Sequence, residues 1–377
     1  MNEIVFNRPH PTGREFDYIG QAIARGYLSG NGPFSQRCAA WLQERTGSPC
    51  ALLTTSCSSA LEMAVLLSGI GPGDEVIMPS YTFVSGANAV ALRGATPVFV
   101  DIRPDTLNLD ERLLEDAITP RTRAILPTHY AGVACEMDAI VDVASRHGLL
   151  VIEDAAQGVL ASYGDRPLGT IGTLGCLSFH ETKNVTCGEG GALLVNDRDW
   201  IERAEIAHEK GTDRRRFFRG EVDKYKWVDL GSSFLPSDIS AAFLWAQLEE
   251  ADRITARRLE IWRLYHERFA EAEARGRLRR PVAPQGCRHN AHMYYLLASD
   301  RSARDALIAA LAEQGIMAVF HYVPLHSSPA GRRLGRAAGD LRVTDEASDR
   351  ILRLPLWVGL GDRDVERIAG AVLAALS

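Results

Sequence analysis

The chain has 377 residues, of which 46% are hydrophobic and 24% are charged, and its formal net charge is -6. This composition is typical of a globular protein with a large buried core, and the length favours two domains. A mild negative charge without a basic block argues against a nucleic-acid or anionic-membrane surface.

Cysteine usage and hydropathy indicate where the protein works. The seven cysteines are odd in number and include no CxxC pair, which fits reduced thiols better than disulfides or a zinc site. No apolar run reaches the roughly 18 residues of a membrane span, and residues 1–14 lack the apolar core of a signal peptide. We therefore expect a cytoplasmic protein without a metal site.

Short apolar runs alternate with helical stretches over the first two-thirds of the chain. The predicted helices include 58–67 and 136–147. The predicted strands are 51–53, 75–78, 97–100, 124–127, 149–152, 174–179 and 191–195. Strands separated by helices predict a mostly parallel sheet that is covered on both faces.

The pattern changes near residue 238. The stretch 238–270 reads as one long helix, because apolar residues recur at helical spacing from Leu244 to Ile261. The elements predicted after it are a strand at 293–297, a helix at 302–314, a strand at 317–321 and a helix at 362–375. We therefore predict an α/β protein with a large domain over residues 1–245 and a smaller α+β domain over residues 246–377.

A carboxylate and a lysine follow predicted strands, where open parallel sheets form their binding sites. Asp154 follows the run 149–152, and it could be a metal ligand, a helix cap or a cofactor partner. Lys183 follows the strand at 174–179 and precedes Gly188, Gly190 and Gly191. A lone loop lysine is usually solvated, but pyridoxal phosphate needs a lysine to form an imine and an acid opposite its ring nitrogen.

Two further segments could hold a flat, phosphorylated cofactor. Residues 55–61 lie between a strand and a helix, and small polar residues that open a helix can bind a phosphate or simply cap the helix. Phe83, after the strand at 75–78, could stack on a ring or belong to the core.

These segments together resemble the DegT/DnrJ/EryC1/StrS aminotransferases, and the likeness covers essentially the whole chain. Residues 56–58 (Ser-Cys-Ser) occupy the place of the family's Ser-Gly-Thr phosphate loop, and residues 79–83 match the segment with the stacking aromatic. Residues 153–157 match the aspartate motif, while Ser178 and Lys183 match the phosphate-binding serine and the cofactor lysine.

The resemblance implies the type I aminotransferase fold, pyridoxal 5′-phosphate as cofactor, and a nucleotide-linked keto-sugar and glutamate as substrates. It implies Lys183 and Asp154 as catalytic residues. The implied cofactor contacts are Lys183, Asp154, Gln157, Ser178, Cys57, Ser58, Phe83 and Ser233.

The chain departs from the wider family at three places. Gln157 stands where many members have histidine, and its side chain can still bond the cofactor's ring oxygen. Cys57 replaces a glycine, which is harmless where only its backbone N–H is used. Residues 231–235 replace a Gly-x-Asn-x-Arg segment through which a neighbouring subunit often contacts the phosphate, so Ser233 would donate instead and a homodimer is expected.

Residues for the sugar come from two segments. His321 and Tyr322 in the smaller domain are expected to line the sugar pocket, although isolated residues of these types are more often structural. Residues 27–32, with Tyr27 and Asn31, resemble a loop that closes over substrate in relatives, and they read equally well as a plain turn.

Two other functions use the same fold. A sugar 3-dehydratase of this family carries histidine where this chain has Lys183, so the lysine argues against that reaction. A catalytically idle regulator that binds the cofactor would not need Lys183, Asp154 and Ser178 together.

Overall fold

A central sheet of eight strands organises the structure, a computed structural model that describes residues 3–376. The strand order is β1–β9–β8–β5–β4–β2–β3–β12, and only β9 runs antiparallel to its neighbours. The bounds are β1 (Cys50–Thr54), β2 (Glu75–Pro79), β3 (Thr96–Val100), β4 (Thr122–Ile125), β5 (Leu150–Asp154), β8 (Leu174–Ser178), β9 (Gly191–Val195) and β12 (Arg336–Ala337). The mostly parallel sheet is thus as predicted.

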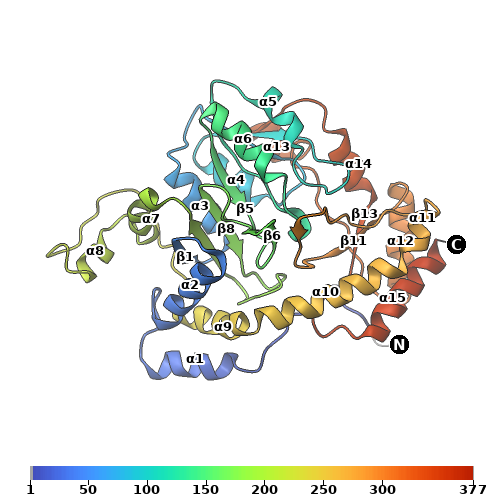
Figure 1. The fold of residues 1–377 in the computed structure, drawn as a ribbon, viewed down its shortest axis with the longest axis horizontal. Coiled ribbons are helices and arrows are strands. Elements are labelled where there is room, and N and C mark those ends of the chain that lie inside the picture. Colours follow the sequence, from blue (N-terminus) through green and yellow to red (C-terminus); the bar gives the residue numbers. More distant parts are fainter. Residues whose placement is uncertain (1–2, 377) are drawn as a thin grey trace.

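Strands β1, β2, β8 and β9 are buried along their whole length, because helices cover both faces of the sheet. The helices of this part are α1 (Glu15–Ala24), α2 (Pro33–Thr46), α3 (Cys57–Leu67), α4 (Ser85–Leu92), α5 (Leu114–Ala117), α6 (Met137–His147), α7 (Ile201–His208) and α8 (Arg214–Phe218). In Figure 1, α8 projects from the body at the left edge of the molecule, beyond α7.

The predicted long helix is interrupted. Residues 238–270 form α9 (Asp238–Glu249) and α10 (Ala251–Arg268), followed by α11 (Ala270–Ala274). At Glu250 the backbone turns to φ -105° and ψ 7°, which ends α9. The break lets α9 pack on α1 and α2, while α10 runs along one side of the molecule to α15 (Asp362–Ala375) (Figure 1).

A second hydrophobic core lies at the far end of α10. It joins Ile261 and Tyr265 of α10 to Leu307 of α12 (Arg301–Glu313) and Ile368 of α15. It packs against the two-stranded sheet of β11 (Tyr294–Leu297) and β13 (Ile351–Leu354). Ile4 also belongs to this core, so the chain's first described residues reach the predicted small domain. The boundary at residue 245 stays a prediction.

The expected strand at 317–321 is wrong. Only Val319 pairs there, through a single bridge to Arg353, while Met317 and Phe320 are exposed. An apolar run that lacks a continuous partner strand does not become a strand. The remaining short elements, β6 (Ser162–Tyr163), β7 (Arg166–Pro167), β10 (Cys287–Arg288), α13 (Pro329–Leu334) and α14 (Arg342–Arg350), were not predicted.

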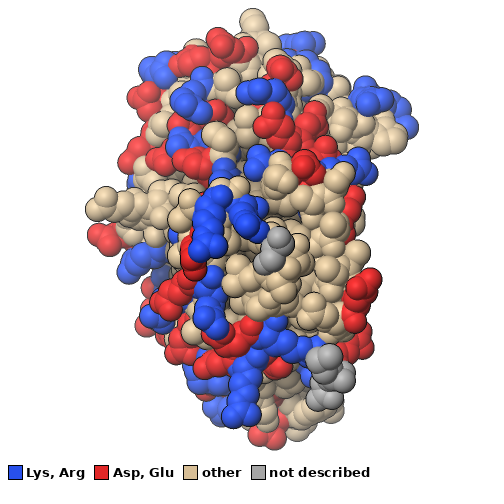
Figure 2. Space-filling model, turned by 90° about the vertical axis from the view of Figure 1, so that its right-hand side faces the viewer, with Lys and Arg blue, Asp and Glu red and all other residues tan. Residues whose placement is uncertain are grey.

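Charged side chains of both signs are mixed over the end of the molecule that carries both termini (Figure 2). Ion pairs such as Arg257–Asp362, which links α10 to α15, account for part of this mixing. None of the helices in residues 3–376 is both long and apolar enough to cross a membrane.

Candidate active site

A cavity of about 780 Å³ lies where several parallel strands end. Asp154 ends β5, Ser178 ends β8, and Thr82 and Thr128 follow β2 and β4. All four line the cavity because the carboxyl ends of parallel strands meet at one edge of the sheet. The volume suits a ligand of the size of a cofactor with a substrate.

Asp154 is only 5% exposed, and few groups neutralise its charge. Its Oδ1 accepts the Ala156 N–H at 3.1 Å, and its Oδ2 accepts the Thr128 hydroxyl at 3.5 Å. Burial raises the pKa of this carboxyl above its ordinary value. A cationic N–H placed beside it would therefore be bound strongly.

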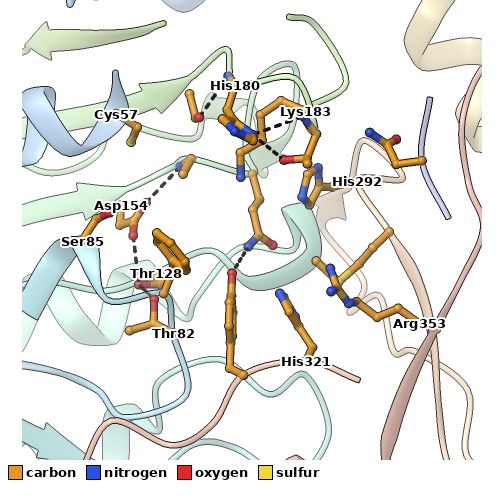
Figure 3. A pocket seen from close by; sticks show the side chains of 18 of the residues that line it. Cys57, Thr82, Ser85, Thr128, Asp154, His180, Lys183, His292, His321 and Arg353 are labelled. Atoms are coloured by element: carbon orange, nitrogen blue, oxygen red, sulfur yellow. Dashed lines mark hydrogen bonds between the residues drawn. The ribbon is translucent and has the colours of Figure 1, made fainter. Parts of the chain in front are cut away.

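Lys183 lies on the connection from β8 to β9 and faces the same cavity (Figure 3). Burial lowers the pKa of its amine below the ordinary value. The connection is tied as a hairpin, since the Phe179 N–H donates to Gly190 O and the Cys187 N–H donates to Phe179 O. Asn184, the next residue, bonds the His292 ring at 3.1 Å and so fixes the segment on its other side. The lysine is therefore held on a rigid support.

The N-terminus of α3 opens into the same cavity. Ser56 caps the helix by accepting the Ser59 N–H at 3.0 Å, while Cys57 and Ser58 line the cavity. The first amides of a helix have no intrahelical partner, so they can bind a phosphate. Burial raises the pKa of the Cys57 thiol well above its usual range, which leaves a neutral thiol and a usable backbone N–H. Ser178 also lines this cavity.

Gln157 is oriented by the backbone. Its Oε1 accepts the Ala131 N–H at 2.6 Å, so its Nε2 points into the cavity and donates to the Tyr322 hydroxyl at 3.2 Å. A bound ring oxygen would meet a donor there. Phe83 lines the cavity and is 57% exposed, so it is not a core residue and its face is free to stack on a ring.

His321 lies on the opposite wall (Figure 3), and Tyr322 lines the cavity beside it. The Tyr130 hydroxyl bonds the His321 ring at 2.8 Å, and burial lowers the pKa of this histidine well below its ordinary value. Tyr322 has φ 31°, an unusual value for a bulky residue, and its ring packs edge-on against Tyr81. Such local strain is common where a side chain is aimed at a ligand.

Three predicted residues do not line this cavity. Ser233 is exposed and pairs through a bridge with Glu209, while Tyr27 and Asn31 lie beside the start of α9. Within one chain the structure does not bring them to the lysine, and their roles stay predictions.

The residues of the cavity that were missed from the sequence include Thr128, Arg258, His292 and Arg353. Arg258 lies inside the long helical pattern, and its Nε and Nη2 donate to Ala291 O and His292 O at 3.1 and 2.7 Å. Arg353 could have been noticed in the sequence, because it is the one charged residue inside the apolar run 351–356.

Known proteins resemble this chain over its whole length. The DegT/DnrJ/EryC1/StrS aminotransferase family matches residues 11–373. GDP-perosamine synthase of Caulobacter vibrioides is 36% identical over 368 residues, which cover 97% of this chain and 96% of that protein.

Two solved structures superpose closely. The aminotransferase TlmJ of Streptoalloteichus hindustanus is 31% identical with a TM-score of 0.91, covering 100% of this chain and 99% of that one. The pyridoxal-phosphate form of the putative sugar aminotransferase Spr1654 of Streptococcus pneumoniae is 26% identical with a TM-score of 0.91, at 100% and 99% coverage.

The fold and the cavity, with its lysine, its aspartate and its helix end, thus define a pyridoxal-phosphate-dependent aminotransferase of type I fold. The prediction of this fold, this cofactor and this class of enzyme is confirmed. More particularly, the chain belongs to the DegT/DnrJ/EryC1/StrS family of aminotransferases, and it is a sugar aminotransferase.

Proposed function

We propose that this enzyme transfers the amino group of L-glutamate to carbon 4 of dTDP-4-dehydro-6-deoxy-D-glucose. The products would be dTDP-4-amino-4,6-dideoxy-D-galactose and 2-oxoglutarate. The proposal rests on a likeness to dTDP-4-amino-4,6-dideoxygalactose transaminase within the family. The stretches that carry this likeness are 79–84, 129–138, 178–184, 217–220 and 317–326.

The observation that supports aminotransfer most directly is the pairing of Lys183 and Asp154 across one cavity. Burial moves the pKa values of the two groups in opposite directions, down for the amine and up for the carboxyl. Among residues 3–376, Asp154 therefore lacks a countercharge, which the cationic ring nitrogen of a bound cofactor would supply. Lys183 likewise lacks a partner there, which the same cofactor would supply. The residues present fit pyridoxal phosphate for this reason.

Pyridoxal phosphate, when bound, would supply a ring that accepts the electron pair of the breaking C–H bond. Lys183 would hold it, and the Lys183 Nζ would take a proton from the donor's α-carbon and later deliver a proton to the sugar carbon. Asp154 would keep the ring nitrogen protonated. The phosphate is assigned to Ser178 and the first amides of α3, the ring oxygen to Gln157 Nε2, and the ring face to Phe83.

The configuration at carbon 4 depends on how the hexose lies over the cofactor, because Lys183 delivers its proton from one side only. Lys183 and Asp154 serve either orientation equally. Residues that grip the sugar must therefore decide between galacto and gluco products, and our candidates are His321, Tyr322, Tyr27 and Asn31.

The active unit would be a homodimer. The arm over residues 210–231, which carries α8, projects from the body in Figure 1 and exposes large apolar side chains, including Phe218 at 69% and Trp227 at 77%. Such apolar surface is usually covered by a partner. The arm ends next to Ser233, which in a dimer would reach the neighbouring cofactor phosphate.

The setting would be the cytoplasm, in the synthesis of a surface polysaccharide. All seven cysteines are free thiols, which suits a reducing compartment. No partner of another kind, neither nucleic acid nor membrane, is proposed.

Product analysis tests the substrate assignment. The purified enzyme is offered glutamate with a panel of dTDP-, UDP- and GDP-linked keto-sugars, and the product is examined by proton NMR. Small couplings from H4 to both H3 and H5 are expected, because an axial amine leaves H4 equatorial. Large couplings at both positions would show an equatorial amine and overturn the galacto assignment, while leaving the aminotransferase class intact.

The alternative within the class is a sugar aminotransferase of another position or stereochemistry, with a 3-amino or a 4-amino-gluco product. One similar enzyme, GDP-perosamine synthase, is named for a GDP-linked sugar, so the panel includes more than one nucleotide. The same panel separates these cases, and it also separates the dehydratase, which would release no amino-sugar, from the idle regulator, which would not react with glutamate.

A further inference from the structure

Arg353 is a positive charge in the cavity wall opposite Asp154 (Figure 3). It is carried by β13, where it lies between Leu352 and Leu354 of the small-domain core. Arg353 and Leu354 both line the cavity, so this end of β13 forms part of the cavity wall. Arg353 is the one charged residue of this strand.

The position of Arg353 is firmly fixed. Its backbone N–H donates to Val319 O at 2.7 Å, and its guanidinium carbon lies 4.7 Å from the centre of the Phe6 ring. An aromatic face holds a guanidinium flat while leaving its edge free. The position of the guanidinium is thus fixed before any ligand binds.

Arg353 has more donors than acceptors around it. A guanidinium carries five N–H groups, yet the side-chain bond seen here is from Nη2 to Phe320 O at 3.2 Å. The buried Nε has no hydrogen-bond partner, and no carboxylate of residues 3–376 forms an ion pair with this arginine. Burial accordingly lowers the pKa of the guanidinium.

The other cations of the cavity are already assigned. Arg258 donates to two backbone carbonyls, and Lys183 is assigned to the cofactor. Arg353 is the remaining arginine among the described lining residues, so an anion entering the cavity would meet it there.

We propose that Arg353 binds the α-carboxylate of the amino-acid donor through two parallel hydrogen bonds. This assignment rests on the proposed aminotransferase function and names the part of the site that recognises its first substrate. A planar fork of donors matches a carboxylate in both charge and shape.

The alternative anion is the diphosphate of the nucleotide sugar. Its distance from the reacting carbon makes it a poorer candidate for binding Arg353. Arg353 and Lys183 line the same cavity, so a small anion bound to Arg353 lies in the space that the reacting amine faces. In an amino acid the carboxylate is one bond from the carbon that carries the amine. In a hexose aminated at carbon 4, the diphosphate is attached at carbon 1, across the ring from the reacting carbon.

The test compares two amines that react with the same form of the holoenzyme. Glutamate and the nucleotide amino-sugar each convert the pyridoxal form to the pyridoxamine form, and absorbance follows both reactions. For Arg353→Gln we expect the apparent KM for glutamate to rise about 10- to 100-fold, as when a charge-assisted hydrogen bond is lost. The KM for the amino-sugar should stay unchanged. Arg353→Lys, which keeps the charge but loses the fork, should lie between.

Two further measurements make the test independent of turnover and of folding. Succinate is an unreactive dicarboxylate that competes with glutamate. It should inhibit the reaction of the wild-type enzyme with glutamate at a lower concentration than it inhibits that of Arg353→Gln. Arg350→Gln is the matched control, because Arg350 lies just before β13 and donates to Ala298 O outside the cavity. It should behave as the wild type does.

Failure of the assignment differs from failure of the proposed function. A defect of Arg353→Gln in the amino-sugar reaction alone would assign Arg353 to the diphosphate and overturn the proposal, as would equal defects with both amines. A wild-type enzyme that ignores glutamate would refute the proposed donor only. The same comparison would then be made with the amino acid that does react, because every such donor has an α-carboxylate.

Discussion

The backbone N–H of Ala131 fixes the side-chain amide of Gln157, donating to its Oε1 at 2.6 Å. Ala131 has φ 59°, so the chain adopts a left-handed turn to present this donor. The consequence is chemical, since only the NH₂ group of Gln157 is left to face the cavity.

Replacing Gln157 tests that orientation. Gln157→Glu keeps the oxygen that Ala131 binds but turns a second oxygen toward the cavity, where it repels the phenolic oxygen of the cofactor. We expect cofactor affinity to fall about 10- to 100-fold, the cost of losing a bond to a charged group. Gln157→His restores a ring N–H and should recover most of the affinity. Equilibrium dialysis measures both, and tight binding by the Glu variant would contradict the orientation.

Lys183→Ala should abolish turnover and the absorbance of the covalently bound cofactor, because no other described lysine lines the cavity. The pyridoxamine form could still bind, since it makes no bond to the lysine. Lys183→Arg is the control for charge, because a guanidinium keeps the cation but cannot take the lysine's place. Full activity in either variant would remove Lys183 from its assigned role.

Asp154→Asn should keep the fold and bind the cofactor, since an amide fits the same space. It removes the charge that holds the ring proton, so kcat should fall by about 100-fold or more, as when a preorganised electrostatic partner is lost. Single-turnover absorbance with glutamate gives the rate. A rate near that of the wild type would mean that another residue holds the ring nitrogen.

Glu153, the neighbour of Asp154, should affect stability instead of chemistry. Its two oxygens accept the N–H groups of Gly169, Ile171 and Gly172, and it bonds the buried ring of His129 at 2.9 Å. Glu153→Gln turns one acceptor into a donor, so we expect unfolding to become easier by about 2–4 kcal/mol. Urea unfolding measures this, and kcat at low temperature should hardly change. An unchanged midpoint would show that the loop tolerates the loss.

Buried histidines should make the protein acid-sensitive. Burial lowers the pKa of His208 to about 3, and its Nε2–H donates to Leu53 O at 2.6 Å. In the unfolded chain His208 binds a proton near pH 6.5, whereas in the folded chain it stays neutral until about pH 3. The stability that the neutral His208 contributes is therefore fully present above pH 6.5 and declines as the pH falls toward 3. The slope is at most about 1.4 kcal/mol per pH unit for each such group.

His208→Gln checks the sign of this effect. A glutamine can donate to the same carbonyl but does not titrate, so the variant should lose less stability than the wild type between pH 6.5 and pH 5. Denaturant titrations at several pH values give the slopes. Equal slopes would show that His208 does not contribute.

The cofactor side of the site could be predicted because its signals are local. Asp154, Ser178 and Lys183 each stand next to the end of an apolar strand, and a parallel sheet gathers such ends at one edge. Arg353 could not be assigned in this way, because its place depends on how β13 packs across the cavity from residues far away in the sequence. The break at Glu250 was equally hidden, since apolar spacing continues through it, and the partner contact of Ser233 depends on a second chain.

The hairpin that carries Lys183 bears on how the substrate specificity of such enzymes can change. Both of its strands lie inside the central sheet, so the backbone that carries the reacting amine is anchored in the core of the molecule. The facing wall at 317–323 forms no regular strand, and it exposes Met317, Phe320 and Val323. Substitutions at these exposed positions can reshape the space above the cofactor while His321 and Tyr322 keep their hydrogen bonds to Tyr130 and Gln157. New sugar specificities are therefore best sought by varying residues 317–323, while the central sheet is left unchanged.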